Sequence, residues 1–167
     1  RFPEMIEAQA QLARVYLKMG DLDSALVAAG NLMERAPENP QSHIVSGVVQ
    51  LARGDFLKAR RHFDQASLIA PDLLQPQLNL ARIARLEGHL ETAESLYRSI
   101  LENFPNNPSA QIELTELLIG SGDFEEVRSR LNQLVEQHPQ MIRVHLMRIE
   151  VLLATVSDKE KITNALY

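Results

Sequence analysis

Glycine and proline recur along this chain at a constant interval of 34 residues. The glycines are Gly20, Gly54, Gly88 and Gly122, and the prolines are Pro3, Pro37, Pro71, Pro105 and Pro139. A fixed period of this length is typical of stacked helical hairpins, in which each unit buries its apolar face against its neighbours. The period therefore predicts an all-α solenoid of antiparallel helix hairpins. Such solenoids present extended surfaces that bind other chains.

Each unit is expected to contain a first helix, a tight turn, a second helix and a loop that holds the proline. Glycine ends the first helix because it enters the left-handed conformation without a Cβ clash. Asp21, Asp55 and Asp123 follow three of the glycines and are predicted to cap the second helices. Proline cannot continue a helix, so the chain must turn back there. The predicted units are 6–39, 40–73, 74–107 and 108–141.

Small residues are expected where the two helices of a hairpin cross closely. They form three pairs with a spacing of twelve residues: Ala13 with Ala25, Gly47 with Ala59, and Ala81 with Ala93. The fourth unit has the larger residues Thr115 and Val127 at the equivalent positions, so its hairpin is predicted to be more loosely packed.

The two ends of the chain depart from the period. Residues 1–5 are interpreted as the end of a preceding repeat, which makes the chain an excised piece of a longer array. Residues 142–154 have the pattern of a further first helix, but no glycine follows at position 156. The sequence from Ser157 to Glu160 has the form of a capping box, which predicts a second helix from there. Residues 142–167 are thus either a truncated fifth repeat or a C-terminal cap.

The composition narrows the possible functions. The 167 residues are 45% hydrophobic and carry a net charge of −5, which argues against nucleic acid as a partner. Cysteine is absent, so disulfides and thiolate metal sites are excluded while the compartment is left open. No apolar run approaches the roughly 20 residues of a membrane span.

No pattern of residues indicates a catalytic, metal-binding or cofactor-binding site. The five histidines are scattered and are interpreted as structural or incidental. No phosphate-binding glycine loop or nucleophile motif is present, and Glu125 and Glu126 are explained by their place at a helix N-terminus. We therefore expect no catalytic residue, no metal site and no cofactor, and predict that this chain is not an enzyme.

The small residues at the crossings, the apolar and aromatic residues around them and the terminal proline resemble the tetratricopeptide repeat (TPR) family. The resemblance covers residues 6–141 and implies a right-handed superhelix with a concave groove. Two features depart from the family pattern. Ala29 and Leu32 reverse the usual order of a large residue before a small one, and the frequent tryptophan of the first helix is absent.

The resemblance also implies which residues line the groove, because the family uses fixed positions of the first helix of each unit. The second unit is almost wholly apolar there, which suggests an anchor for a peptide at Ile44, Val45 and Val48. An alternative is that these apolar residues pack within the array. Basic residues gather toward the N-terminal side and acidic ones toward the C-terminal side, and the partial fifth unit adds Arg143, Leu146, Met147 and Glu150. The candidate binding residues are Arg14, Lys18, Ile44, Val45, Val48, Leu51, Leu78, Asn79, Arg82, Arg85, Ile112, Glu113 and Glu116.

One known type of ligand can be tested against the pattern. Chaperone-binding members of the family hold a C-terminal carboxylate with a clamp of Lys, Asn and Arg side chains. The equivalent residues here are Ala10, Arg14, Val45, Gln75 and Asn79, so the clamp is missing. A ligand of this type is not expected.

Three segments are similar to long bacterial TPR proteins of the cell envelope, among them the lipoproteins associated with exosortase and exopolysaccharide systems. These segments are 54–66, 77–82 and 105–110. The likeness implies a non-enzymatic scaffold for protein or peptide partners in envelope secretion or exopolysaccharide export, with a periplasmic location. The alternative is a regulatory TPR domain of a larger enzyme or sensor. The oligomeric state cannot be inferred from the pattern.

Overall fold

The computed structural model describes the backbone of residues 3–122 and 124–165 and the side chains of residues 5–122 and 124–155. Within these residues all regular structure is helical, which confirms the all-α fold class. The helices follow the 34-residue period closely. They are α1 (Pro3–Met19), α2 (Leu22–Arg35), α3 (Pro40–Ala52), α4 (Phe56–Ile69), α5 (Leu74–Leu86), α6 (Leu90–Asn103), α7 (Pro108–Ser121), α8 (Phe124–Gln137) and α9 (Ile142–Ala165).

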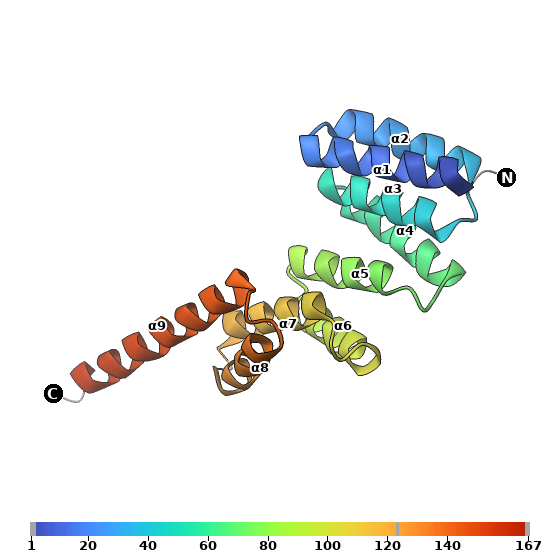
Figure 1. Ribbon diagram of the computed structural model, residues 1–167. Helices are drawn as coiled ribbons and strands as arrows, with labels where there is room; N and C mark the ends of the chain where they lie inside the picture. Colours follow the sequence, from blue (N-terminus) through green and yellow to red (C-terminus); the bar gives the residue numbers. More distant parts are fainter. Residues whose placement is uncertain (1–2, 123, 166–167) are drawn as a thin grey trace. The chain divides into compact units, whose positions relative to one another are not determined.

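The chain divides into two compact units, Arg1–Leu96 and Tyr97–Tyr167, with the division inside α6. In the first unit, α1 pairs with α2 and α3 pairs with α4, while α1, α3 and α5 lie side by side (Figure 1). In the second unit, α7 pairs with α8 and α9 packs on α8. Each unit is therefore built from hairpins joined by tight turns.

The turns form as the sequence predicts. All four glycines of the period have a positive φ between 75° and 83°, a conformation in which a Cβ would be strained. Oδ1 of Asp21 accepts a hydrogen bond from the Ser24 backbone N at 3.0 Å, and Oδ1 of Asp55 accepts one from the Lys58 N at 3.1 Å. The predicted caps at Asp21 and Asp55 are thus confirmed, whereas Asp123 lies outside the described residues.

Small residues do occupy the interior of the hairpins. Ala13, Ala25, Ala59, Ala81 and Ala93 are completely buried. Gly47 has a more specific reason to be small, because a Cβ there would lie only 2.7 Å from Cε1 of Phe63. The ring of Phe63 thus fills the space that a side chain at position 47 would need. Thr115 and Val127 are completely buried too, and their looser packing stays a prediction.

The N-terminus differs from the expectation by three residues. Helix α1 begins at Pro3 and not at Ile6, so Pro3 lies in the first turn of a helix instead of in a loop between repeats. Proline is tolerated there because its missing N–H would have no partner within the helix. Pro40 and Pro108 also open helices, and each follows an asparagine cap that the sequence reasoning missed.

The C-terminus corrects a second expectation. Helix α9 runs without a break from Ile142 to Ala165, so the predicted second helix starting near Ser157 is wrong. In the four complete units a glycine ends the first helix, but Val156 stands at the equivalent position here and provides no left-handed stop. The C-terminal part of α9 extends past α8 (Figure 1). Whether residues 142–167 form a cap or a truncated repeat stays a prediction.

Among the described residues, none of the helices combines the length and apolar character that a membrane crossing requires.

Candidate protein-binding surface

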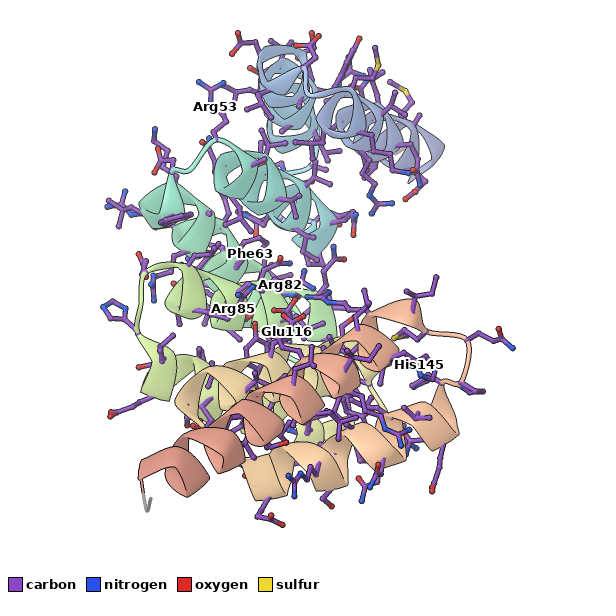
Figure 2. All side chains as sticks on the ribbon, turned by 90° about the vertical axis from the view of Figure 1, so that its left-hand side faces the viewer. Arg53, Phe63, Arg82, Arg85, Glu116 and His145 are labelled. Atoms are coloured by element: carbon purple, nitrogen blue, oxygen red, sulfur yellow. The ribbon has the colours of Figure 1, made fainter. Side chains whose placement is uncertain are left out.

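The first helices of the N-terminal unit present one row of equivalent residues. Arg14, Val48 and Arg82 are spaced by 34 residues on α1, α3 and α5, which lie side by side. The side chain of Arg14 is 42% exposed, while Val48 and Arg82 are half-buried. Arg82 extends from α5 together with Arg85 (Figure 2). The row therefore places an apolar side chain between two guanidinium groups.

A second row lies one helical turn further along the same helices. It consists of Leu17, Leu51 and Arg85, all half-buried, with the exposed Lys18 beside Leu17. Val48 and Leu51 pack against the buried cluster of Ala59, Phe63 and Ile83, so their inner sides contact the core. The rows are thus anchored in the core, and of their basic residues Lys18 is exposed while the three arginines are half-buried.

Several predicted binding residues do not reach the surface. Ile44 and Val45 are only 2% and 3% exposed, and Val45 belongs to a core cluster with residues of α1 and α2. Leu78 and Asn79 are also buried, and the Asn79 amide donates to the Gln75 carbonyl oxygen at 2.8 Å. These positions lie on the side of the helix that faces neighbouring helices. Of the three residues predicted as an anchor, Val48 alone keeps accessible surface.

In the C-terminal unit the predicted acidic residues are engaged by other side chains. Ile112 and Glu113 are buried, and the Tyr97 hydroxyl donates to Oε2 of Glu113 at 3.3 Å. Glu116 is half-buried and forms an ion pair with Arg143 at 2.6 Å. Two of the predicted carboxylates thus have partners, and on the basic side Arg14 pairs with Glu7 at 4.0 Å. The predicted segregation of charge stays a prediction.

A recurring hydrogen bond ties the proline loops to the first helices. The donors are equivalent side chains, His43, Gln77, Gln111 and His145, which reach the carbonyl oxygen of the proline six residues earlier. The donor–acceptor distances are 2.7 to 2.9 Å. We call this contact the proline latch. It gives His43 and His145 a structural role, in agreement with the prediction for the histidines. The signal for it, a polar donor every 34 residues, was available in the sequence.

His43 also meets a second histidine. Its Nδ1 lies 3.4 Å from Nδ1 of His62 on α4. Because Nε2 of His43 donates to the Pro37 carbonyl, the neutral ring accepts at Nδ1 and His62 donates. Burial, and to a smaller degree the neighbouring His43, lowers the pKa of His62. In the described part of the chain, no group of three or more potential ligands is close enough to hold a metal ion.

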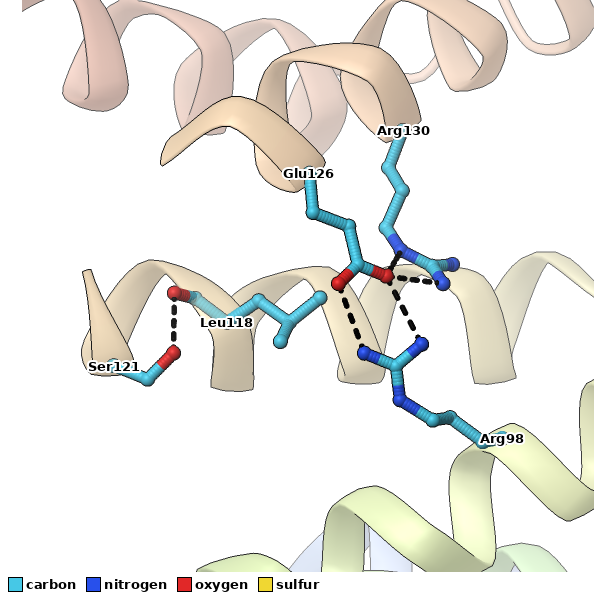
Figure 3. A network of polar contacts seen from close by, with 5 residues as sticks. All are labelled: Arg98, Leu118, Ser121, Glu126 and Arg130. Carbon is cyan, nitrogen blue, oxygen red and sulfur yellow. Dashed lines mark hydrogen bonds and ion pairs between the residues drawn. The ribbon is translucent and has the colours of Figure 1, made fainter. Parts of the chain in front are cut away.

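An ionic network joins α6 to α8 within the C-terminal unit (Figure 3). Glu126 accepts two hydrogen bonds from the Arg98 guanidinium, at 3.0 and 2.9 Å, and pairs with Arg130 at 2.7 Å. The hydrogen bonds from Arg98, followed by those from Arg130, lower the pKa of Glu126 to about 2. The network holds successive repeats together and needs no catalytic explanation.

Two apolar surfaces lie outside the predicted binding residues, except for Leu146, which the family pattern places in the groove. One is a depression of about 360 Å³ between α1 and α2, beside which Val27 is well exposed. Arg61, Ser95 and Ser129 are the equivalent residues of the other repeats, so an apolar residue at this position was a readable signal. The other surface is on α9, where Ile142, Leu146, Ile149 and Leu153 are exposed.

Comparisons with known proteins agree with this architecture. Models of the tetratricopeptide repeat family match residues 10–72 and 84–148. The chain belongs to the tetratricopeptide repeat family. A solved structure of similar fold is TTC0263, a thermophilic TPR protein of Thermus thermophilus. It has a TM-score of 0.78 and 23% identity, over 89% of this chain and 81% of that one.

Two curated proteins are similar over about half of this TPR chain. One is a DnaJ homolog subfamily C member 7 homolog of Schizosaccharomyces pombe, 27% identical over 86 residues and 52% of the chain. The other is tetratricopeptide repeat protein 21B of Xenopus laevis, 29% identical over 97 residues and 58% of the chain. The matches span only 18% and 7% of the length of these relatives.

Proposed function

We propose that this chain is a non-enzymatic interaction module that binds a protein segment on the exposed rows of α1, α3 and α5. The observation that carries the proposal is the row Arg14, Val48 and Arg82, in which one apolar residue lies between two basic ones. TPR proteins generally mediate protein–protein interactions, which supports a protein or peptide as the partner.

The surface favours an extended or helical segment with an apolar side chain flanked by acidic residues. The apolar side chain would cover Val48 and Leu51, while its acidic neighbours would meet Arg14, Lys18, Arg82 or Arg85. A desolvated apolar anchor supplies most of the affinity, and charges at the rim act mainly through the rate of association. Ile44 and Val45 would support the anchor from the core without touching the ligand.

The test starts from a random peptide library displayed on phage and selected on the immobilised chain. Selected peptides should be enriched in Asp and Glu beside a single large apolar residue. Val48→Asp should weaken their binding by about 2 kcal/mol or more in titration calorimetry. Arg82→Glu should weaken it less and mainly at low salt, because salt screens exposed charges.

Val27→Asp is the matched control, since it introduces the same change at an exposed valine on α2. It should leave binding unchanged, and circular dichroism melts should show that all three variants fold. Normal binding by Val48→Asp would contradict the proposal. Unfolding of Val48→Asp would do so as well, because it would assign Val48 to the core.

The cellular setting that we propose is a bacterial envelope assembly for secretion or exopolysaccharide export, with the parent protein in the periplasm. Its support is the likeness of residues 54–66, 77–82 and 105–110 to TPR proteins of that kind. Fractionation of cells that express the tagged parent protein tests it, because recovery in the cytoplasm would contradict a periplasmic role.

A regulatory TPR domain within a larger enzyme or sensor is the second candidate. The observation that favours it is the small share of the curated relatives that this chain spans. The sequence that flanks the chain in its parent decides between the two, since a catalytic domain there would support regulation and further repeats would support a scaffold.

A further inference from the structure

Helix α9 exposes a row of large aliphatic side chains along one face. Ile142, Leu146, Ile149 and Leu153 are between 53% and 73% exposed. They are separated by four, three and four residues, the spacing that brings side chains onto one stripe of a helix. We call these four residues the α9 stripe. The opposite face, with Val144, Met147 and Val151, is buried in the C-terminal unit.

The equivalent residues of the preceding repeats show what is unusual about the stripe. Leu146 corresponds to Ala10, Ile44, Leu78 and Ile112, all of which are buried. Ile149 corresponds to Ala13, Gly47, Ala81 and Thr115, which are buried as well. At these two positions the face is therefore covered in every complete repeat, whereas in α9 it is open.

The chain up to Ala165 cannot cover the stripe itself, because α9 continues as one helix through the position where the other repeats turn back. Ile149 also changes the geometry of the contact. A close hairpin crossing uses Ala or Gly at this position, and a β-branched residue requires a wider helix separation. The four-three-four spacing of large residues suits the wider packing of a two-helix coiled coil.

We propose that the α9 stripe binds the same stripe of a second copy of this chain, with the two α9 helices antiparallel. A two-fold interface requires a self-complementary surface, and the charges beside the stripe provide one. Arg143 and Glu150 lie on the same flank, one heptad apart. In the antiparallel arrangement each Arg143 faces the Glu150 of the other copy, so two opposite-charge pairs form at once.

Both charged groups can reach a partner. Glu150 is exposed on α9, and the Arg143 side chain is 54% exposed although it pairs with Glu116. A guanidinium has five N–H donors, so Arg143 can hold Glu116 and a second carboxylate together. The arrangement would give each α9 the antiparallel neighbour that the first helix of a complete repeat finds in its own hairpin.

The experiment is sedimentation equilibrium of the purified chain across a range of concentrations. A concentration-dependent dimer is expected. Ile149→Glu should raise its dissociation constant roughly a thousandfold, because the substitution occurs twice in a two-fold interface. Leu68→Glu is the control, since Leu68 is similarly exposed on α4, and it should leave the dimer intact. Circular dichroism melts establish that the variants fold.

Charge reversal tests the antiparallel pairing itself. Glu150→Arg alone and Arg143→Glu alone should each weaken the homodimer, because each places like charges together on both sides. A mixture of the two variants should form a one-to-one heterodimer, in which both pairs are again opposite in charge. Failure of the mixture to associate would overturn the pairing.

Two other results would overturn the proposal as a whole. A wild-type chain that stays monomeric at every soluble concentration would show that the stripe does not bind a second copy. Loss of association in Val27→Glu would indicate a head-to-tail contact through the α1–α2 surface. Peptide binding on α1, α3 and α5 is measured separately, so neither result bears on the proposed function.

Discussion

The α3–α4 and α7–α8 hairpins occupy the same 34-residue register but fill it with different side chains. In α3–α4, Gly47 leaves room for the ring of Phe63. The equivalent residues of α7–α8 are Thr115 and Leu131, both buried, so the residue on the first helix is larger and the one on the second is smaller. The comparison indicates that volume is exchanged between these two positions of a hairpin while the register is kept.

The two hairpins also have different polar residues at equivalent positions. His43 and His62 are in contact across α3–α4, whereas the equivalent residues of α7–α8 are Gln111 and Arg130. Gln111 keeps the proline latch, and Arg130 joins the ionic network around Glu126. One hairpin therefore contains an imidazole with a lowered pKa, that of His62, and the other a carboxylate with a lowered pKa, that of Glu126, so acid should affect them in different pH ranges.

The largest expected effect comes from placing the residue of one hairpin into the other. Gly47→Thr copies Thr115 and should cost about 3 kcal/mol in free energy of unfolding, because its side chain would overlap the Phe63 ring. Phe63→Leu copies Leu131 and should cost about 1–2 kcal/mol through lost packing. The double variant should be more stable than the sum of the two losses implies, by about 1 kcal/mol or more in denaturant titrations. Additive losses would mean that the two positions do not share their volume.

The second expected effect concerns the small residue on the second helix of each hairpin. It stands four residues after the position that precedes that helix. Ala59 and Ala93 are completely buried at this position, so Ala59→Leu or Ala93→Leu should overpack the crossing and cost roughly 1–3 kcal/mol. Val127→Leu should cost less, because the α7–α8 hairpin already accommodates a valine there. Equal shifts of the denaturation midpoint at all three sites would refute the idea that the fourth hairpin is more loosely packed.

The regular features of the fold could be predicted because each depends on one residue type at one position. Glycine at a positive φ, aspartate at a helix start and alanine at a crossing act within a few residues of themselves, so the period shows them directly. Burial of Ile44, Val45 and Glu113 depends on which neighbouring helix lies opposite, and a periodic pattern does not contain that. The capping-box pattern at Ser157 predicts a helix start, but without a glycine at position 156 nothing ends the preceding helix, so α9 continues through it.

The third prediction concerns the ionic network of α8. The pKa of Glu126 is about 2 in the folded state, below its ordinary value of 4.5. Between these two pH values the carboxylate is therefore ionised in the folded chain and protonated in the unfolded chain. Its contribution is complete above about pH 5 and is lost as the pH falls toward 2. Glu126→Gln should remove on the order of 1 kcal/mol at neutral pH, since solvent screens part of the interaction.

The matching control for that prediction is Glu125→Gln, which alters the neighbouring carboxylate. Glu125 is 90% exposed and pairs with Arg128 at the surface. Urea titrations at several pH values should show a flatter acid dependence in Glu126→Gln and an unchanged one in Glu125→Gln. The same flattening in both variants would assign the acid response to net charge instead of to the network.

The smallest expected effect belongs to the histidine pair of α3–α4. The pKa of His62 is lowered in the folded state, so below about pH 6.5 the unfolded chain binds more protons and the free energy of unfolding falls as the pH falls. The loss between about pH 7 and 5 should stay below about 1 kcal/mol, because His62 is only half-buried. His62→Gln should abolish this pH dependence in urea titrations across the same range.

His43→Gln copies Gln77 and Gln111, so it should keep the proline latch to Pro37 and remove only the smaller cause of the lowered pKa of His62. It should therefore reduce the pH dependence only in part, since burial of His62 remains. Complete loss of the dependence in His43→Gln would show that the neighbouring imidazole, and not burial, keeps His62 neutral.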